Sequence, residues 1–301
     1  MLSLVLPKGS SLEQRTLDLF AAAGLKISRP SARAQRGTIA YGGAIRVVFC
    51  KPREIPPVVG SGAFDFGLTG GDWVEETGAK VETLASLTYA KTSNAPWRIV
   101  LAVPADHPAT DVRDLRSGTR VATEYVNIGR RFLEEAGLNA EVVRSFGATE
   151  AKIPELADAV IDVVETGDSL RHNGLRVLQT IRTCTPQVIA GPHALADDTK
   201  RDRIDKVVRL LRAAAAETPC TMITVRVPGP HLHTVTPLMP AGSWLAGTDL
   251  ADADIVVLQG RAPRAELLER TDALLAAGAL DITESDIHRT VPAYASRLSP
   301  G

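Results

Sequence analysis

The chain has 301 residues, of which 45% are hydrophobic and 23% charged, and its formal net charge at pH 7 is −1. This length allows two or three domains, and the composition is that of a globular rather than a disordered protein. A near-neutral charge without a basic block argues against nucleic-acid binding. With no apolar run near about 20 residues and no signal peptide, we expect a cytoplasmic protein without a membrane contact. The scattered Cys50, Cys184 and Cys220 fit a reducing compartment better than a disulfide framework or a zinc site.

The N-terminal third alternates between short apolar strands and helical patterns. Alternation of this kind predicts a mostly parallel sheet covered by helices. The expected strands are residues 3–6, 44–49 and 64–68, and the expected helices are residues 12–22, 53–59 and 72–77.

A second alternating set begins near Trp97 and continues to residue 189. Two α/β lobes that meet at a cleft are the simplest architecture for two such sets, and ligands then bind at the carboxyl ends of the strands. The last two strands of this set either stay in the second lobe or return the chain to the first. Strands are expected at residues 98–103, 119–122, 141–143, 159–164, 176–181 and 187–189, and helices at 127–136 and 148–155.

The pattern changes after a strongly amphipathic helix at residues 202–216. The remaining elements follow a βαββαβ-like order, which is typical of small ligand-sensing domains, although such a module can equally serve only for dimerisation. Strands are expected at residues 221–227, 254–259 and 280–283, and helices at 230–236 and 263–277.

The most informative stretch is residues 158–175. A buried strand at Ala159–Val164 is interrupted only by Asp162, and a tight turn from Glu165 to Ser169 then opens into a short helix. A strand, a Thr-Gly turn and a helix start present backbone N–H groups and hydroxyls to an anion, as in phosphate sites. Asp162 and Glu165 would stand beside that anion and accept bonds from sugar hydroxyls or hold Mg²⁺ through water. The alternative is an ordinary loop in which Thr and Ser only cap the helix.

Two more loops follow strands in the N-terminal third. Lys8 follows the first strand and is a candidate contact for a polyphosphate, the alternative being a loop lysine in solvent. Gly70 allows close backbone approach to a ligand, while Asp72 either joins that site or caps the next helix. The glycine pattern matches neither a P-loop nor a dinucleotide-binding fingerprint.

Polar clusters occupy two strand-to-helix junctions of the second set. Glu124 and Tyr125 follow one strand, and Glu150 precedes an expected helix. Tyr125 either stacks on a base or covers the core. The pair His231 and His233 has no nearby cysteine or carboxylate, which argues against a metal site there.

Taken together, these segments resemble the long form of ATP phosphoribosyltransferase, in order and at the spacing of that family. The matching segments are residues 6–10, 51–56, 67–74, 97–104, 122–127, 146–152 and 158–175. The resemblance implies a two-lobed periplasmic-binding-protein-like (type II) α/β core plus a C-terminal ferredoxin-like, ACT-type α+β domain. The implied domains are residues 1–92 with 183–216, residues 93–182, and a regulatory or oligomerisation domain at 217–301.

The resemblance also implies a reaction. N1 of ATP displaces pyrophosphate from C1 of phosphoribosyl pyrophosphate, with Mg²⁺ present, in the first step of histidine biosynthesis. Lys8, Glu124, Glu150 and Asp162 would be catalytic, and Asp162 and Glu165 would bind the metal through water or substrate. The implied substrate-binding residues are Gly9, Lys51, Gly70, Asp72, Tyr125, Glu165, Thr166, Gly167, Asp168, Ser169 and Leu170.

This chain departs from the family in three places. Many relatives carry an arginine shortly after the Lys8 turn, where this chain has Ser10 and Ser11. Asp168 stands where relatives carry a small neutral residue, and we expect its carboxylate to point into solvent, since facing a phosphate would cost about 3 kcal/mol. Trp244 stands where relatives carry a small hydroxyl residue, so we expect a weak or absent response to histidine. The helix and strand pattern of this domain is intact, so we still expect it to mediate a homo-oligomer, either a dimer or a hexamer. The rival functions are a paralogue that uses another nucleophile and a non-catalytic ligand-binding or regulatory subunit.

Overall fold

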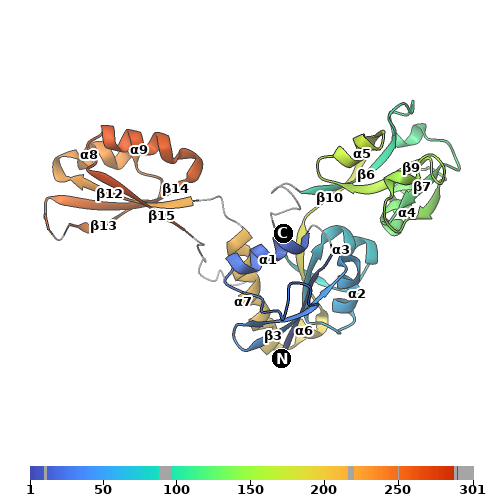
Figure 1. Ribbon diagram of the computed structural model, residues 1–301, viewed down its shortest axis with the longest axis horizontal. Helices are drawn as coiled ribbons and strands as arrows, with labels where there is room; N and C mark the ends of the chain where they lie inside the picture. The colour runs from blue at the N-terminus through green and yellow to red at the C-terminus, as the bar shows by residue number, and fades with distance from the viewer. Residues whose placement is uncertain (10–11, 88–95, 216–219, 250, 288–289, 291–301) are drawn as a thin grey trace. The chain divides into compact units, whose positions relative to one another are not determined.

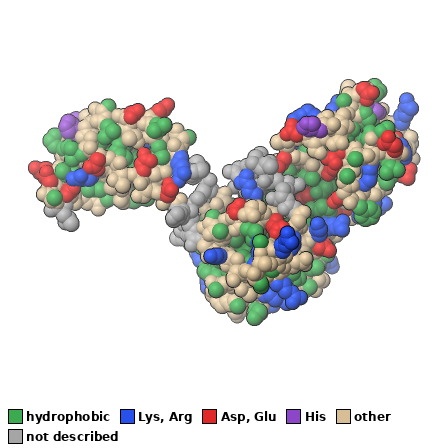
Figure 2. All heavy atoms as spheres, viewed as in Figure 1, with side chains coloured by type: hydrophobic (Ala, Val, Ile, Leu, Met, Phe, Trp, Pro, Cys, Tyr) green, Lys and Arg blue, Asp and Glu red, His purple; other side chains and the backbone are tan. Residues whose placement is uncertain are grey.

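The computed structural model describes residues 1–9, 12–87, 96–215, 220–249, 251–287 and 290. The chain divides into two compact units, residues 1–215 and residues 216–301 (Figure 1). On the face shown in Figure 2, acidic and basic side chains are mixed over both units, as the balanced charge leads one to expect. Within the described ranges, no helix is long and apolar enough to cross a membrane.

The larger unit contains a six-stranded sheet in the order β2-β3-β1-β4-β11-β5. Strand β1 is central and parallel to β3 and β4, while β2 and β11 run antiparallel to their neighbours. Every residue of β1 is buried, which is the pattern of a strand covered on both faces. The strands are β1 (Leu2–Pro7), β2 (Arg36–Ala40), β3 (Ala44–Cys50), β4 (Phe66–Gly70), β5 (Glu82–Ser86) and β11 (Pro186–Ala190). The helices are α1 (Leu12–Ala22), α2 (Ile55–Gly60), α3 (Gly71–Thr77), α6 (Pro192–Ala196) and α7 (Asp198–Ala215).

A second, five-stranded sheet in the same unit has the order β10-β6-β9-β7-β8. Strands β7, β8 and β9 are parallel, so their carboxyl ends share one edge. The strands are β6 (Trp97–Pro104), β7 (Arg120–Thr123), β8 (Glu141–Arg144), β9 (Ala159–Val164) and β10 (Leu175–Cys184), and the helices are α4 (Val126–Glu135) and α5 (Asp168–His172).

The chain leaves the six-stranded sheet after β5 and returns to it in β11. Residues 1–215 therefore form a first lobe around the six-stranded sheet and a second lobe around the five-stranded one. This is the two-lobed periplasmic-binding-protein-like architecture that the sequence predicts. The return of the chain to the first lobe is confirmed for residues 187–189 but is wrong for residues 176–181, which belong to β10 of the five-stranded sheet.

The smaller unit folds in the order β-α-β-β-α-β, with the sheet order β13-β14-β12-β15. This order is ferredoxin-like, as expected of an ACT-type domain. Alternate residues of β12 pack with Val235 and Leu274 in a separate core. Its elements are β12 (Cys220–Pro228), α8 (Leu232–Val235), β13 (Trp244–Thr248), β14 (Ile255–Pro263), α9 (Leu267–Ala276) and β15 (Asp281–Asp286). Trp244 lies on the edge strand β13 and is 45% exposed, so within this chain it lies on the surface and does not fill a pocket.

One expected helix is wrong. Residues 148–155 contain only a 3₁₀ turn at Glu150–Lys152. Pro154 disfavours the helical region for the residue before it, and Ile153 is extended accordingly. Three strands, β2, β5 and β13, are not predicted. They lie at sheet edges and are mostly exposed, so their sequences carry no clear alternation.

Asp65, which precedes β4, holds three elements together. Its Oδ2 accepts the backbone N–H and the hydroxyl of Ser3 on β1, both at 2.7 Å, and its Oδ1 accepts Lys200 Nζ of α7 at 2.7 Å. Burial opposes ionisation, but these hydrogen bonds outweigh it and lower the pKa of Asp65. The carboxylate therefore stabilises the fold while it is charged.

Replacing Asp65 with Ala should lower the free energy of unfolding by about 3 kcal/mol at pH 7, because it leaves buried donors of Ser3 and the Lys200 charge unpaired. Since the folded pKa is lowered, the difference from the parent should shrink as the pH falls below roughly 4. Urea unfolding of the full chain at several pH values measures this. Asp198→Ala, which removes a 95% exposed carboxylate, is the control and should change little. Equal effects of the two substitutions would contradict the account.

Candidate active site

In both lobes, the predicted site residues follow the carboxyl ends of parallel strands or are among the last residues of those strands. In the first lobe Lys8 follows β1, Lys51 follows β3 and Gly70 ends β4. In the second lobe Glu124 follows β7, and the turn at residues 165–169 follows β9. Carboxyl ends of parallel strands are where α/β proteins bind ligands.

The first lobe places two ammonium groups at its edge. Lys8 Nζ donates to the backbone oxygen of Arg33 at 2.9 Å, and the backbone N–H of Gly9 donates to Glu13 Oε2 at 2.9 Å. A Cβ atom at Gly9 would lie 3.0 Å from Lys51 Nζ, and Gly9 has a φ of +67°. The positive φ favours glycine at this turn, whereas the flexible end of Lys51 could move to make room for a Cβ atom.

The second lobe gathers carboxylates around Asp162 on β9. Burial, together with the nearby carboxylates of Glu150 and Glu124, raises the pKa of Asp162 to about 6, against hydrogen bonds from Val163 and Thr149 that lower it. The Val163 N–H donates to Asp162 Oδ1 at 2.7 Å. The three predicted catalytic carboxylates thus form one electrostatic cluster, although they come from separate loops and strands.

The predicted phosphate turn is anchored by the buried side chain of Leu170, and Gly167 takes a φ of +81° at the start of α5. Both hydroxyls of the turn donate to carboxylates. Ser169 Oγ donates to Glu150 Oε1 at 2.7 Å, which connects the turn to the carboxylate cluster. Thr166 Oγ1 donates to Asp168 Oδ2 at 2.6 Å.

Asp168 is exposed, as expected, and it also forms an ion pair with Arg171. The hydrogen bonds from Thr166 and Arg171 lower the pKa of Asp168. Its charge is therefore partly balanced within the turn.

Tyr125 connects the two lobes. Its hydroxyl donates to Asp72 Oδ2 of α3 at 2.7 Å, and its ring stacks on Trp73 with centroids 4.6 Å apart. Burial and the adjacent Asp72 carboxylate raise the pKa of Tyr125 well above its usual value, so the phenol stays protonated. Only 4% of Tyr125 is exposed. The expectation that this ring stacks on a base is therefore wrong for this arrangement, and the alternative, a tyrosine that covers the core, fits.

A cavity of about 660 Å³ opens between the lobes beside this pair. Trp73 supplies an aromatic wall, and Arg53 and Arg144 supply positive charge from opposite lobes. Glu124 is the only predicted site residue among the residues that line it. Trp73 and Arg53 lie within motifs that the sequence singles out, but spacing alone does not indicate which way their side chains point.

Asp162 and Glu165 are the predicted metal-binding residues. Among the described residues, no group of three or more His, Cys, Asp or Glu side chains is placed to hold a metal ion. Mg²⁺ commonly binds through one or two carboxylates together with substrate phosphates and water, so the carboxylate cluster around Asp162 fits it without a complete protein cage.

The chain matches the family model of ATP phosphoribosyltransferase over residues 51–213. It is 38% identical to ATP phosphoribosyltransferase of Chlorobium phaeovibrioides, over 97% of this chain and 98% of that one. It is 37% identical to the enzyme of the same name from Pelotomaculum thermopropionicum, over 97% of this chain and 99% of that one.

Among solved structures, the ATP phosphoribosyl transferase (HisG:HisZ) complex from Thermotoga maritima contains a similar chain. The TM-score is 0.58 at 23% identity, and the similarity covers 70% of this chain and 98% of that one. At this identity the likeness speaks for the fold alone. The full-length sequence relatives and the family model decide the family: this chain belongs to the ATP phosphoribosyltransferases.

Proposed function

We propose that the cleft between the two lobes, with the carboxylates around Asp162 next to the hydroxyl-bearing turn, carries out the reaction of the family. That reaction transfers the 5-phosphoribosyl group of phosphoribosyl pyrophosphate to N1 of ATP, the first step of histidine biosynthesis. The observation that carries the assignment is the hydrogen bond from Ser169 to Glu150. It brings the predicted phosphate turn and the predicted catalytic carboxylates into one site.

In the transfer, the N1 lone pair forms a bond to C1 of the ribose while the bond from C1 to the pyrophosphate oxygen breaks. ATP acts as a nucleophile, so no P-loop is needed. Catalysis comes from positioning and from stabilising charge on the leaving group. We assign the residues Thr166 to Leu170 to the 5-phosphate, Asp162 and Glu165 to the ribose hydroxyls, and Lys8, Gly9 and Lys51 to the pyrophosphate.

The metal in this proposal is Mg²⁺, held by Asp162 and Glu165 through water or through the substrate. When bound, it neutralises charge that develops on the departing pyrophosphate. Asp162 is suited to such a position because burial and two acidic neighbours leave its carboxylate short of positive charge.

The cavity beside Trp73 is our candidate for the acceptor nucleotide. Its aromatic wall fits an adenine ring, and Arg53 and Arg144 fit the triphosphate. Glu124 belongs both to this cavity and to the carboxylate cluster. The acceptor would therefore approach the ribose from the Glu124 side. Gly70 and Asp72 do not line this cavity, and their role in substrate binding stays a prediction.

The remaining assignments stay predictions. They are the catalytic lobes at residues 1–92 with 183–216 and at 93–182, a regulatory or oligomerisation domain at 217–301, a homo-oligomer, a cytoplasmic location and a weak histidine response. The surface position of Trp244 removes the reason given above for that weak response. The rival functions, transfer to another nucleophile and a non-catalytic subunit, have no specific observation in their favour.

Incubating the purified chain with phosphoribosyl pyrophosphate, ATP and Mg²⁺ should give phosphoribosyl-ATP and pyrophosphate in equal amounts. Chromatography with mass detection identifies both products. Adding other purines and azoles in place of ATP tests the rival function, in which the chain transfers the phosphoribosyl group to another nucleophile. If ATP gives no product while a homologue does under the same conditions, the proposed function is wrong.

The substitution Asp162→Asn should have opposite effects on stability and on activity. The folded pKa of about 6 exceeds the unfolded value of about 3.9, so the stability of the parent falls as the pH rises between these values. The variant lacks this loss and should be more stable than the parent at pH 8, by up to about 3 kcal/mol, but not at pH 4. Its kcat/KM should fall at least about tenfold. Urea unfolding and kinetics measure the two effects, and equal destabilisation at both pH values would contradict the account.

Asp168→Ser should change KM for phosphoribosyl pyrophosphate less than about threefold, because the carboxylate is exposed and already paired with Arg171. Asp168→Asn, which keeps an acceptor for Thr166 without the charge, is the matched control. Steady-state kinetics of the parent and both variants measure the change in KM. A tenfold or larger fall in KM for Asp168→Ser would mean that this acid opposes the phosphate.

A further inference from the structure

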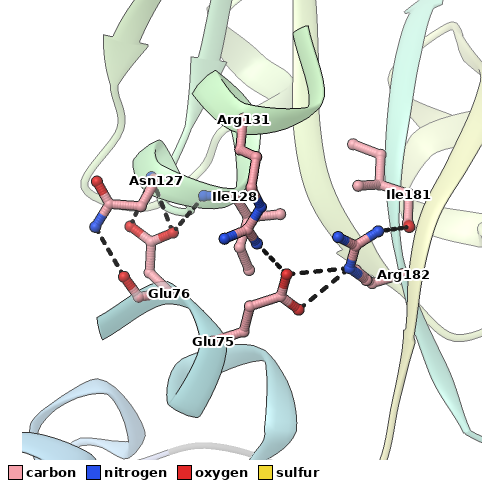
Figure 3. A network of polar contacts seen from close by, with 7 residues as sticks. All are labelled: Glu75, Glu76, Asn127, Ile128, Arg131, Ile181 and Arg182. Atoms are coloured by element: carbon pink, nitrogen blue, oxygen red, sulfur yellow. Dashed lines mark hydrogen bonds and ion pairs between the residues drawn. The ribbon is translucent and has the colours of Figure 1, made fainter. Parts of the chain in front are cut away.

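Helix α4 receives its N-terminal cap from the other lobe. The carboxylate of Glu76 on α3 accepts the backbone N–H of Asn127 at 3.0–3.1 Å and that of Ile128 at 3.0 Å (Figure 3). Asn127 Nδ2 donates in return to the backbone oxygen of Glu76 at 2.8 Å. Tyr125, at the N-cap position, uses its hydroxyl for Asp72 instead.

This capping contact is strong for physical reasons. The first N–H groups of a helix have no partner within the helix and carry partial positive charge, so a carboxylate is a favourable acceptor there. Glu76 is only 6% exposed. If α4 moved away from α3, both the carboxylate and the helix amides would lose their partners in a site with little access to water.

Glu75, the neighbouring residue, forms a second link to the same lobe. Its carboxylate forms an ion pair with Arg131 of α4 and accepts Arg182 Nε of β10 at 3.1 and 3.2 Å (Figure 3). Arg182 also donates to the backbone oxygen of Ile181 at 3.0 Å. Glu75 is more exposed than Glu76. Its partner strand β10 is close in sequence to β11, through which the chain returns to the first lobe. Of the two contacts, the one made by Glu76 is therefore specific to the cavity.

We propose that Glu76 is a positioning residue for the transfer, acting through the first turn of α4. The inference rests on the proposed function, because Glu76, Asn127 and Glu124 line the cavity assigned above to the acceptor. Glu124 lies two residues before α4 begins. By capping α4 from α3, Glu76 fixes Glu124 and the second-lobe wall of the cavity relative to Trp73.

The position of the contact predicts which substrate it affects. The predicted phosphate turn is held by Leu170 and by the Ser169–Glu150 hydrogen bond, neither of which involves α3. Loss of the cap should therefore impair the acceptor side and leave the phosphoribosyl side nearly unchanged.

The experiment compares Glu76→Ala, Glu76→Gln and the control Glu134→Ala in the full chain. Glu134 is an exposed carboxylate at the other end of α4. Glu76→Ala should raise KM for ATP at least about fivefold and change KM for phosphoribosyl pyrophosphate less than about twofold. Glu76→Gln keeps one oxygen for Asn127 and Ile128, so it should stay within about threefold of the parent. Glu134→Ala should resemble the parent.

Amide hydrogen exchange tests the cap without substrate. In Glu76→Ala, the amides of Asn127 and Ile128 should exchange at least about tenfold faster, while Glu76→Gln should protect them. If the parent makes no product, the proposed function fails but the exchange result still decides the cap. Faster exchange with unchanged KM for ATP, or equal rises in both KM values, would overturn the positioning role. If Glu76→Ala does not fold, failure of Glu76→Gln to keep ATP kinetics near those of the parent would overturn it as well.

Discussion

The contacts that α3 makes with the second lobe are the interaction on which the candidate site depends. Asp72, Glu75 and Glu76 occupy one short helix, and each carboxylate binds donors that belong to the other lobe. A buried carboxylate is costly unless it is fully hydrogen-bonded, so Asp72 and Glu76, which are both buried, favour one arrangement of the lobes over others. The cavity beside Trp73 exists only in such an arrangement, since residues of both lobes line it.

The charges on the two lobes differ in a way that suits a pyrophosphate ester of ribose. Lys8 and Lys51 lie at the edge of the first lobe, whereas Asp162, Glu150 and Glu124 are grouped in the second. Cations are suited to the leaving pyrophosphate, while carboxylates are suited to ribose hydroxyls and to a divalent cation. In the proposed reaction, this separation would place cations beside the leaving group and carboxylates beside the ribose.

The sequence predicts the frame of the molecule better than its detailed contacts. Buried parallel strands such as β1 and β9 are apolar runs bounded by turns that contain glycine, so the local sequence is enough to predict their positions. The helix expected at residues 148–155 fails because Pro154 outweighs the helical pattern before it. Asp162, Glu150 and Ser169 can be proposed from the sequence because each lies at or near a strand end. The sequence does not indicate the role of Glu76, because its partners are about fifty residues away on another lobe. In the sequence, a glutamate on a helix cannot be told from a solvent-exposed one. The sequence leaves two roles open for Tyr125, because spacing cannot show that Trp73 covers its ring.

The central claim is that one cleft binds the phosphoribosyl donor at the turn after β9 and the acceptor nucleotide at the cavity beside α4. Hydrogen-exchange footprinting of the full chain, with phosphoribosyl pyrophosphate and Mg²⁺ in one sample and ATP and Mg²⁺ in another, tests it most directly. The account predicts that the donor slows exchange at residues 165–170 and that ATP slows it at residues 124–128 and 144–145. Protection of neither segment, or protection of residues 165–170 by ATP alone, would contradict it.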